Sequence, residues 1–105
     1  MKSVRVALLI GFSLAPCAAE AQSFSCRYAS RSDEVVICQN AGLAALDERM
    51  AATYERLRSR LSGGARQGLI SDQSAWLRSR YRCGSDAGCI EDSYRQRIDE
   101  LRSNY

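Results

Sequence analysis

The stretch that decides the fold is QSAWLRSRYRCGSDAGC, residues 73–89. It holds the only tryptophan of the chain and ends in two cysteines on either side of a glycine-containing turn. Residues at spacings of three and four mark one side of a helix: Gln73, Trp76, Leu77, Arg80 and Cys83. Gly84 then ends this helix, and the next helix is predicted to begin near Asp86. A disulfide between Cys83 and Cys89 would clamp the two helices together.

The N-terminal residues 1–21 have the pattern of a secretory signal peptide. The pattern consists of a basic start with Lys2 and Arg5, an apolar run over residues 6–14 and a small-x-small cleavage motif at residues 19–21. The apolar run is too short to cross a bilayer as a permanent helix. We therefore expect no stable membrane span and a domain over residues 22–105 that is periplasmic or secreted.

Cys17 offers an alternative processing route, because Leu14-Ala15-Pro16-Cys17 is similar to a lipoprotein cleavage box. Proline directly before the cysteine suits that peptidase poorly, so cleavage after Ala21 is the favoured interpretation. Lipidation through Cys17 stays open as the alternative.

Four cysteines, Cys26, Cys38, Cys83 and Cys89, lie behind the predicted signal peptide. In an exported domain of this size we expect two disulfides, because so small a core needs covalent support. Four cysteines allow three pairings, and proximity in sequence favours Cys26–Cys38 and Cys83–Cys89. A four-cysteine zinc site is the alternative, but the chain lacks a C-x2-C pair.

The remaining segments also have helical patterns. Ser32 is a candidate N-cap for a short helix that ends at Cys38, and residues 40–42 indicate a stop or a bend. The clearest helix is predicted from a stripe at helical spacing: Leu43, Leu46, Met50, Tyr54, Leu57 and Leu61. Residues 62–64 end it, a third helix runs from about Ala65 to Arg82, and a fourth runs to about Ser103.

The predicted fold is all-α, because no segment alternates with the period of two that strands require. Short turns between the longer helices make them antiparallel neighbours. The sequence thus predicts a small disulfide-stapled helical bundle, with three longer antiparallel helices and a short N-terminal helix.

Four groups of residues resemble a known family. They are Cys26 with DEVVIC at residues 33–38, LAALD at residues 43–47 with Tyr54, Gln73-x-x-Trp76-Leu77-x-x-Arg80-x-x-Cys83-Gly84, and Cys89-Ile90 with Tyr94-x-x-Arg97-Ile98-x-x-Leu101. In order and spacing they resemble the N-terminal domain of LprI-type lysozyme inhibitors, also known as DUF1311. Tyr81 departs from the pattern, since members often have an acidic residue after the matching arginine. The resemblance implies an exported, all-helical envelope protein with disulfides paired in sequential order, and it suggests inhibition of lysozyme.

Enzymatic activity has little support in the sequence. The chain has no histidine, which excludes His-based dyads, triads and His-ligated metal sites. Carboxylates could in principle form a glycosidase pair, but the candidates are expected on solvent-facing helix positions: Asp47, Glu48, Asp92 and Glu100. We therefore predict a non-enzyme without a metal or cofactor. The net charge of +3, with acidic residues interleaved, also falls far short of a nucleic-acid-binding stripe.

Three residues of the opening stretch are expected to have structural roles. Trp76 is predicted to lie in the core, with its indole N–H in need of a partner. Gln73 lies one turn earlier on the same side and is expected to make a buried hydrogen bond. Arg80 is expected to cap backbone carbonyls near the Cys83 turn.

Two functions from different classes fit these observations. The first is a protein inhibitor that blocks a lysozyme or another cell-wall hydrolase by inserting a turn into a cleft that holds catalytic carboxylates. The candidate turns are residues 62–66, where Arg66 would pair with a carboxylate, and residues 84–88.

The alternative is a non-inhibitory accessory module that holds an envelope protein or peptidoglycan. Its predicted surface is an arginine face of the second predicted helix, over residues 43–61, formed by Arg49, Arg56 and Arg60. The sequence leaves the partner and the oligomeric state open.

Overall fold

The structure is a computed structural model that describes residues 22–105. The predicted signal peptide, its cleavage motif and the Cys17 alternative lie outside the described residues. Four α-helices and one short 3-10 helix follow one another along the chain: η1 (Cys26–Tyr28), α2 (Ser32–Gln39), α3 (Ala41–Arg60), α4 (Gly63–Tyr81) and α5 (Ala87–Ser103). Residues 22–105 contain no strand, so the predicted all-α fold is confirmed.

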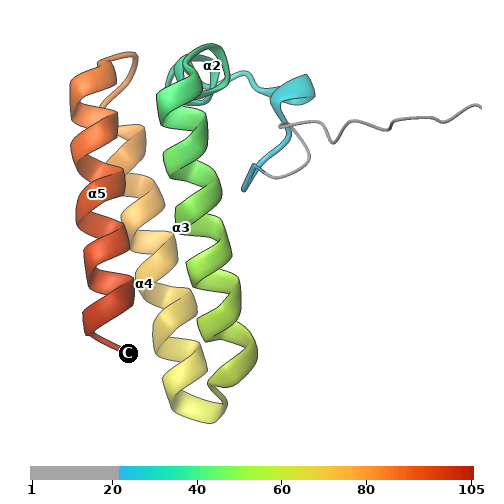
Figure 1. Ribbon diagram of the computed structural model, residues 1–105, viewed down its shortest axis with the longest axis vertical. Helices are drawn as coiled ribbons and strands as arrows, with labels where there is room; N and C mark the ends of the chain where they lie inside the picture. Colours follow the sequence, from blue (N-terminus) through green and yellow to red (C-terminus); the bar gives the residue numbers. More distant parts are fainter. Residues whose placement is uncertain (1–21) are drawn as a thin grey trace, which may run out of the picture.

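The three long helices run side by side along the length of the molecule, and α2 lies across the end where α3 begins (Figure 1). α3 packs most extensively against α5, whereas α3 and α4 touch each other over a much smaller region. A groove lies between α3 and α4.

The helix boundaries differ from the predicted ones by one or two residues. Ser32 was expected as an N-cap but is the first helical residue, and Arg31 takes the cap position without a side-chain bond. The break predicted at residues 40–42 is confirmed, since α2 ends at Gln39, and the Asn40 side chain also accepts a hydrogen bond from the Leu43 backbone N–H at 3.1 Å. Asn40 therefore caps the start of α3, which is why α3 follows α2 with a single residue between them.

Both turns between the long helices depend on glycine. Gly63 and Gly84 have φ angles of +56° and +58°, in the left-handed region that other residues rarely adopt. After Gly84, the Asp86 side chain accepts a hydrogen bond from the Cys89 backbone N–H at 3.1 Å and begins α5. The predicted break at Gly84 and helix start near Asp86 are both confirmed.

Two disulfides join the cysteines that proximity favoured. Cys26 bonds to Cys38 and ties η1 to α2, and Cys83 bonds to Cys89 across the α4–α5 turn. The chain-entropy model gives loops of this length a stabilisation of about 2–3 kcal/mol each.

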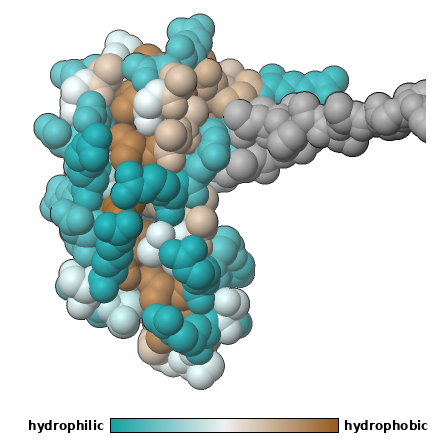
Figure 2. Space-filling view, viewed as in Figure 1, coloured by the Kyte–Doolittle hydropathy of each residue, from teal (hydrophilic) through white to brown (hydrophobic). Residues whose placement is uncertain are grey.

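The core is a single cluster of apolar side chains from all four α-helices. Its members are Ile37, Leu43, Leu46, Met50, Leu57, Leu69, Trp76, Ile90, Tyr94, Ile98 and Leu101. Each fully buried aliphatic side chain contributes about 1.5–3 kcal/mol relative to an exposed one. Figure 2 shows apolar side chains in a band along the middle of one face, with hydrophilic side chains on both sides of it. No helix in residues 22–105 is long and apolar enough to span a membrane.

Candidate functional site

Arg80 enters the core from α4 and is only 1% exposed. Its Nε donates a hydrogen bond to Asp33 Oδ2 of α2 at 2.9 Å, and its Nη1 donates to the Tyr94 hydroxyl of α5 at 3.1 Å. The sequence had predicted a cap on carbonyls near the Cys83 turn, and that role is wrong. Arg80 instead joins α4 to α2 and α5. Its partner Asp33, 47 residues away in sequence, is also only 1% exposed.

Asp33 also has a second arginine partner at the surface. Arg31 Nε lies 3.3 Å from Asp33 Oδ1, and its side chain is 44% exposed. The Arg31 guanidinium carbon stacks 3.5 Å from the ring centre of Tyr81. Tyr81 stands where the sequence pattern led us to expect an acidic residue. Its ring instead offers an aromatic face to the Arg31 cation, and such a cation–π contact is favourable.

Asp47 is fully buried, although the sequence predicted it on a solvent-facing position. Its Oδ1 accepts hydrogen bonds from the Tyr94 hydroxyl at 2.7 Å and from Ser23 Oγ at 2.7 Å. The Ser23 backbone N–H donates to the other oxygen at 2.6 Å. Asp47 therefore fastens the N-terminal segment to α3 and α5. A signal was available, because Asp47 lies at helical spacing from Leu43 and Met50.

The charges of this buried network shift the ionisation of its members. Burial and the Asp47 carboxylate raise the pKa of the Tyr94 phenol above its ordinary value, although Arg80 opposes them. Burial alone would lower the pKa of Arg80, but Tyr94, Asp33 and Asp47 outweigh it, so that pKa is raised. At neutral pH the network holds a protonated tyrosine and a charged arginine.

Gln73 and Trp76 lie beside this network. Gln73 Oε1 accepts a hydrogen bond from Arg97 Nε at 2.9 Å, and its Nε2 donates to the Met50 sulfur at 3.2 Å. The Trp76 indole N–H donates to the Ser93 backbone carbonyl at 3.0 Å. Arg97 is 2% exposed and bonds to Glu100 as well. Sequence reasoning gave Arg97 no role of its own, because arginine is expected at the surface by residue type, although Arg97 lies at helical spacing from Tyr94 and Leu101.

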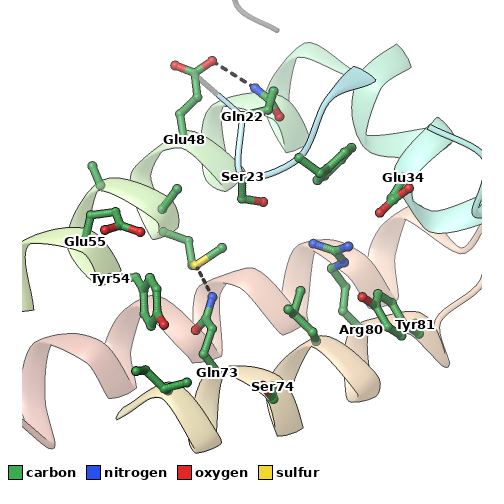
Figure 3. A pocket seen from close by; sticks show the side chains of 16 residues that line it. Gln22, Ser23, Glu34, Glu48, Tyr54, Glu55, Gln73, Ser74, Arg80 and Tyr81 are labelled. Carbon is green, nitrogen blue, oxygen red and sulfur yellow. Dashed lines mark hydrogen bonds between the residues drawn. The ribbon is translucent and has the colours of Figure 1, made fainter. Parts of the chain in front are cut away.

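A groove of about 850 Å³ lies between α3 and α4, and Arg80 of the buried network is one of the residues that line it. Apolar side chains and alanines form most of its floor: Phe24, Met50, Ala51, Ala52, Tyr54, Ile70 and Leu77. Figure 3 shows Gln73 pointing across this floor toward the Met50 sulfur, with Arg80 and Tyr81 at one end. Gln22 closes part of the rim, since its amide donates to Glu48 at 3.2 Å.

The rim of the groove is acidic. Glu48 and Glu55 rise from α3 two turns apart, and Glu34 comes from α2 (Figure 3). Arg80 is the one basic residue among those that line the groove, and Asp33 neutralises it. The groove therefore presents three carboxylates, although the chain as a whole is positively charged.

The comparisons with known proteins decide the family. The model of the family described as Lysozyme inhibitor LprI matches residues 26–101. The chain belongs to this family. The comparison with curated proteins found no match, and neither did the comparison with solved structures. The residues matched to LprI include both disulfides and, except for Ser23, every member of the Arg80 network.

The LprI match leaves the predicted partner-binding arginines untested, and the structure places them outside the groove. Arg66 lies in the first turn of α4, where its Nε donates to the Arg58 carbonyl at 3.0 Å. Arg56 and Arg60 are exposed on α3, and Arg56 donates to Thr53 at 3.3 Å. Within residues 22–105, no cluster of three or more Asp, Glu or Cys side chains is placed to hold a metal ion.

Proposed function

We propose that this chain is an exported inhibitor that binds a lysozyme or another cell-wall hydrolase and blocks it without chemistry of its own. The match to the LprI family over residues 26–101 carries the proposal. The chemistry of the chain agrees with it, since the sequence has no histidine and all four cysteines of residues 22–105 are in disulfides.

The scaffold suits a protein that acts by binding. The Arg80–Asp33 ion pair, the Tyr94–Asp47 hydrogen bond and two disulfides join the four α-helices. Its surface is therefore held in one shape before a partner arrives, which lowers the ordering cost of association. Two disulfides also fit the oxidising space outside the cytoplasm, where cell-wall hydrolases act.

Steric blocking is sufficient for inhibition of such an enzyme. Lysozymes cut a polysaccharide with two carboxyl groups that face each other across an open cleft. A rigid protein on or beside that cleft excludes the polymer without the need for a reactive group. The proposal therefore requires a stable complex and no turnover.

The test is a titration of the protein into a cell-wall lysis assay. The full chain is expressed for export, purified with its disulfides formed, and added to animal-type, invertebrate-type and goose-type lysozymes. We expect the lysis rate of at least one class to approach zero at stoichiometric excess. Unchanged rates for every class would contradict the proposal and favour the accessory-module hypothesis, which a pull-down from envelope extracts then addresses.

A further inference from the structure

The floor of the α3–α4 groove is an apolar surface that the four helices leave uncovered in residues 22–105. Tyr54 and Leu77 pack against the core from its edge and are partly buried. Ile70 is also only partly buried. Such a strip of half-buried apolar side chains, bounded by polar groups, is typical of a binding surface.

The charges around the groove select the kind of partner. Glu48 and Glu55 are seven residues apart and lie on the same face of α3, about 10 Å from each other along the helix axis. Exposed arginines of the same helix, Arg56 and Arg60, do not line the groove. α3 therefore places Glu48 and Glu55 toward the groove and these two arginines elsewhere, while Arg58 Nη1 lies 3.7 Å from Glu55 in an exposed pair.

We infer that this groove is the docking surface for a cationic segment of a protein partner. Apolar side chains of the segment lie on the partly exposed floor formed by Tyr54, Ile70 and Leu77, and its lysines or arginines face Glu48 and Glu55. Glu34 extends the same interaction toward α2. The inference rests on the proposed function for its choice of a protein as partner, and it replaces the turn at Arg66 as the contact surface.

Charge complementarity favours this occupant over the others. Peptidoglycan carries carboxylates in its peptide stems, and three glutamates would repel them. Nucleic acid is disfavoured for the same reason. Animal-type lysozymes are basic proteins, so a locally acidic groove supplies an attraction that the positive net charge of the whole chain does not.

A peptide titration tests the groove without any assumption about lysozyme. The probe is an amphipathic helical peptide of about 14 residues, made of leucine and lysine, and its control is the same peptide with glutamate in place of lysine. Amide signals of the labelled protein are followed by NMR. We expect the lysine peptide to shift the signals of Ala51, Ile70 and Leu77, and the glutamate peptide to shift none of them.

Charge reversal gives the matched comparison. Glu48→Arg with Glu55→Arg is expected to weaken lysine-peptide binding about tenfold or more, because rim repulsion replaces attraction. Asp92→Arg with Asp99→Arg makes the same charge change at the same spacing on the exposed side of α5, and should change binding less than about twofold. Glu48→Gln with Glu55→Gln keeps the size of the side chains and serves if the reversed variant does not fold.

Three results would overturn the inference: equal losses in both double variants, shifts that map away from the groove, or equal binding of both peptides. A further result concerns a second copy of the chain. If sedimentation shows a dimer that the Glu48 and Glu55 variants dissociate, the occupant is the chain itself and the choice of partner is wrong. If the protein binds the lysine peptide in the groove but inhibits no lysozyme, only the proposed function is contradicted.

Discussion

At the scale of single residues, the protein keeps a charged arginine in its core by surrounding it with partners. Arg80 and Asp33 are each 1% exposed and form an ion pair at 2.9 Å. The Tyr94 hydroxyl accepts a second hydrogen bond from Arg80 and donates one to Asp47. Burial of ions is costly unless all their hydrogen-bonding groups are engaged. Here the network also orients four helices, so loss of one member affects all of them.

Removal of Arg80 should therefore be severe. Arg80→Ala leaves the buried Asp33 carboxylate without its core partner, and we expect it to lower the free energy of unfolding by about 3–5 kcal/mol. Arg78→Ala removes an exposed arginine of the same helix and should change it by less than about 0.5 kcal/mol. Urea denaturation followed by circular dichroism measures both. Similar losses in the two variants would show that the buried pair is not special.

The Tyr94 phenol gives the network a pH dependence. Its pKa is raised in the folded protein, so native Tyr94 keeps its proton at a pH where the unfolded chain loses it. The stabilisation is complete below about pH 10, the ordinary value, and is lost as the pH rises above it. The loss is at most about 1.4 kcal/mol per pH unit.

Tyr94→Phe removes this titration and should flatten the fall in unfolding free energy between about pH 10 and 11. Tyr28→Phe changes a tyrosine that is 76% exposed and should leave the slope as in the wild type. Urea denaturation at a series of pH values compares the three proteins. An unchanged slope in Tyr94→Phe would contradict the assignment of a protonated Tyr94 to the buried network.

At the scale of helices, glycines at two kinds of position should respond in opposite ways. Gly68 lies inside α4, and a Cβ added there would meet no neighbouring atom within 4 Å. Gly68→Ala should therefore raise the free energy of unfolding by about 0.5–1 kcal/mol, through helix propensity and reduced entropy of the unfolded chain.

Gly84 supplies the opposite case in the same experiment. Its φ of +58° strains any residue with a Cβ, so Gly84→Ala should lower the free energy of unfolding by about 1–2 kcal/mol. Thermal and urea unfolding of both variants give the signs directly. A stabilised Gly84→Ala, or a destabilised Gly68→Ala, would contradict the assigned backbone conformations.

Helical periodicity was sufficient to predict the elements, because apolar stripes report which face of a helix is buried. It located α3, α4 and α5 to within about two residues. It failed at Asp47, since a carboxylate was assigned to solvent by residue type although its position fits the stripe. The Arg80–Asp33 pair was not foreseen, because it joins residues 47 apart in sequence. The groove was also missed, since it depends on how far α4 stands from α3, and no local pattern encodes that spacing.

At the scale of the whole molecule, the proposed function lies on one face of a rigid bundle. The LprI family match supports the proposed class of partner, and the α3–α4 groove is a surface with apolar and acidic character. The sequence-based hypotheses assigned partner contact to arginines instead: Arg66 for the inhibitor, and the α3 arginines for the accessory module. The two surfaces differ in charge, so opposite substitutions separate them.

The most direct test compares two double variants in the lysozyme titration. We expect Glu48→Arg with Glu55→Arg to raise the concentration for half-inhibition about tenfold or more, because it reverses the charge of the docking rim. Arg56→Glu with Arg60→Glu tests the competing arginine surface and should change that concentration by less than about twofold. Full inhibition by the first variant, together with loss of inhibition in the second, would contradict the account.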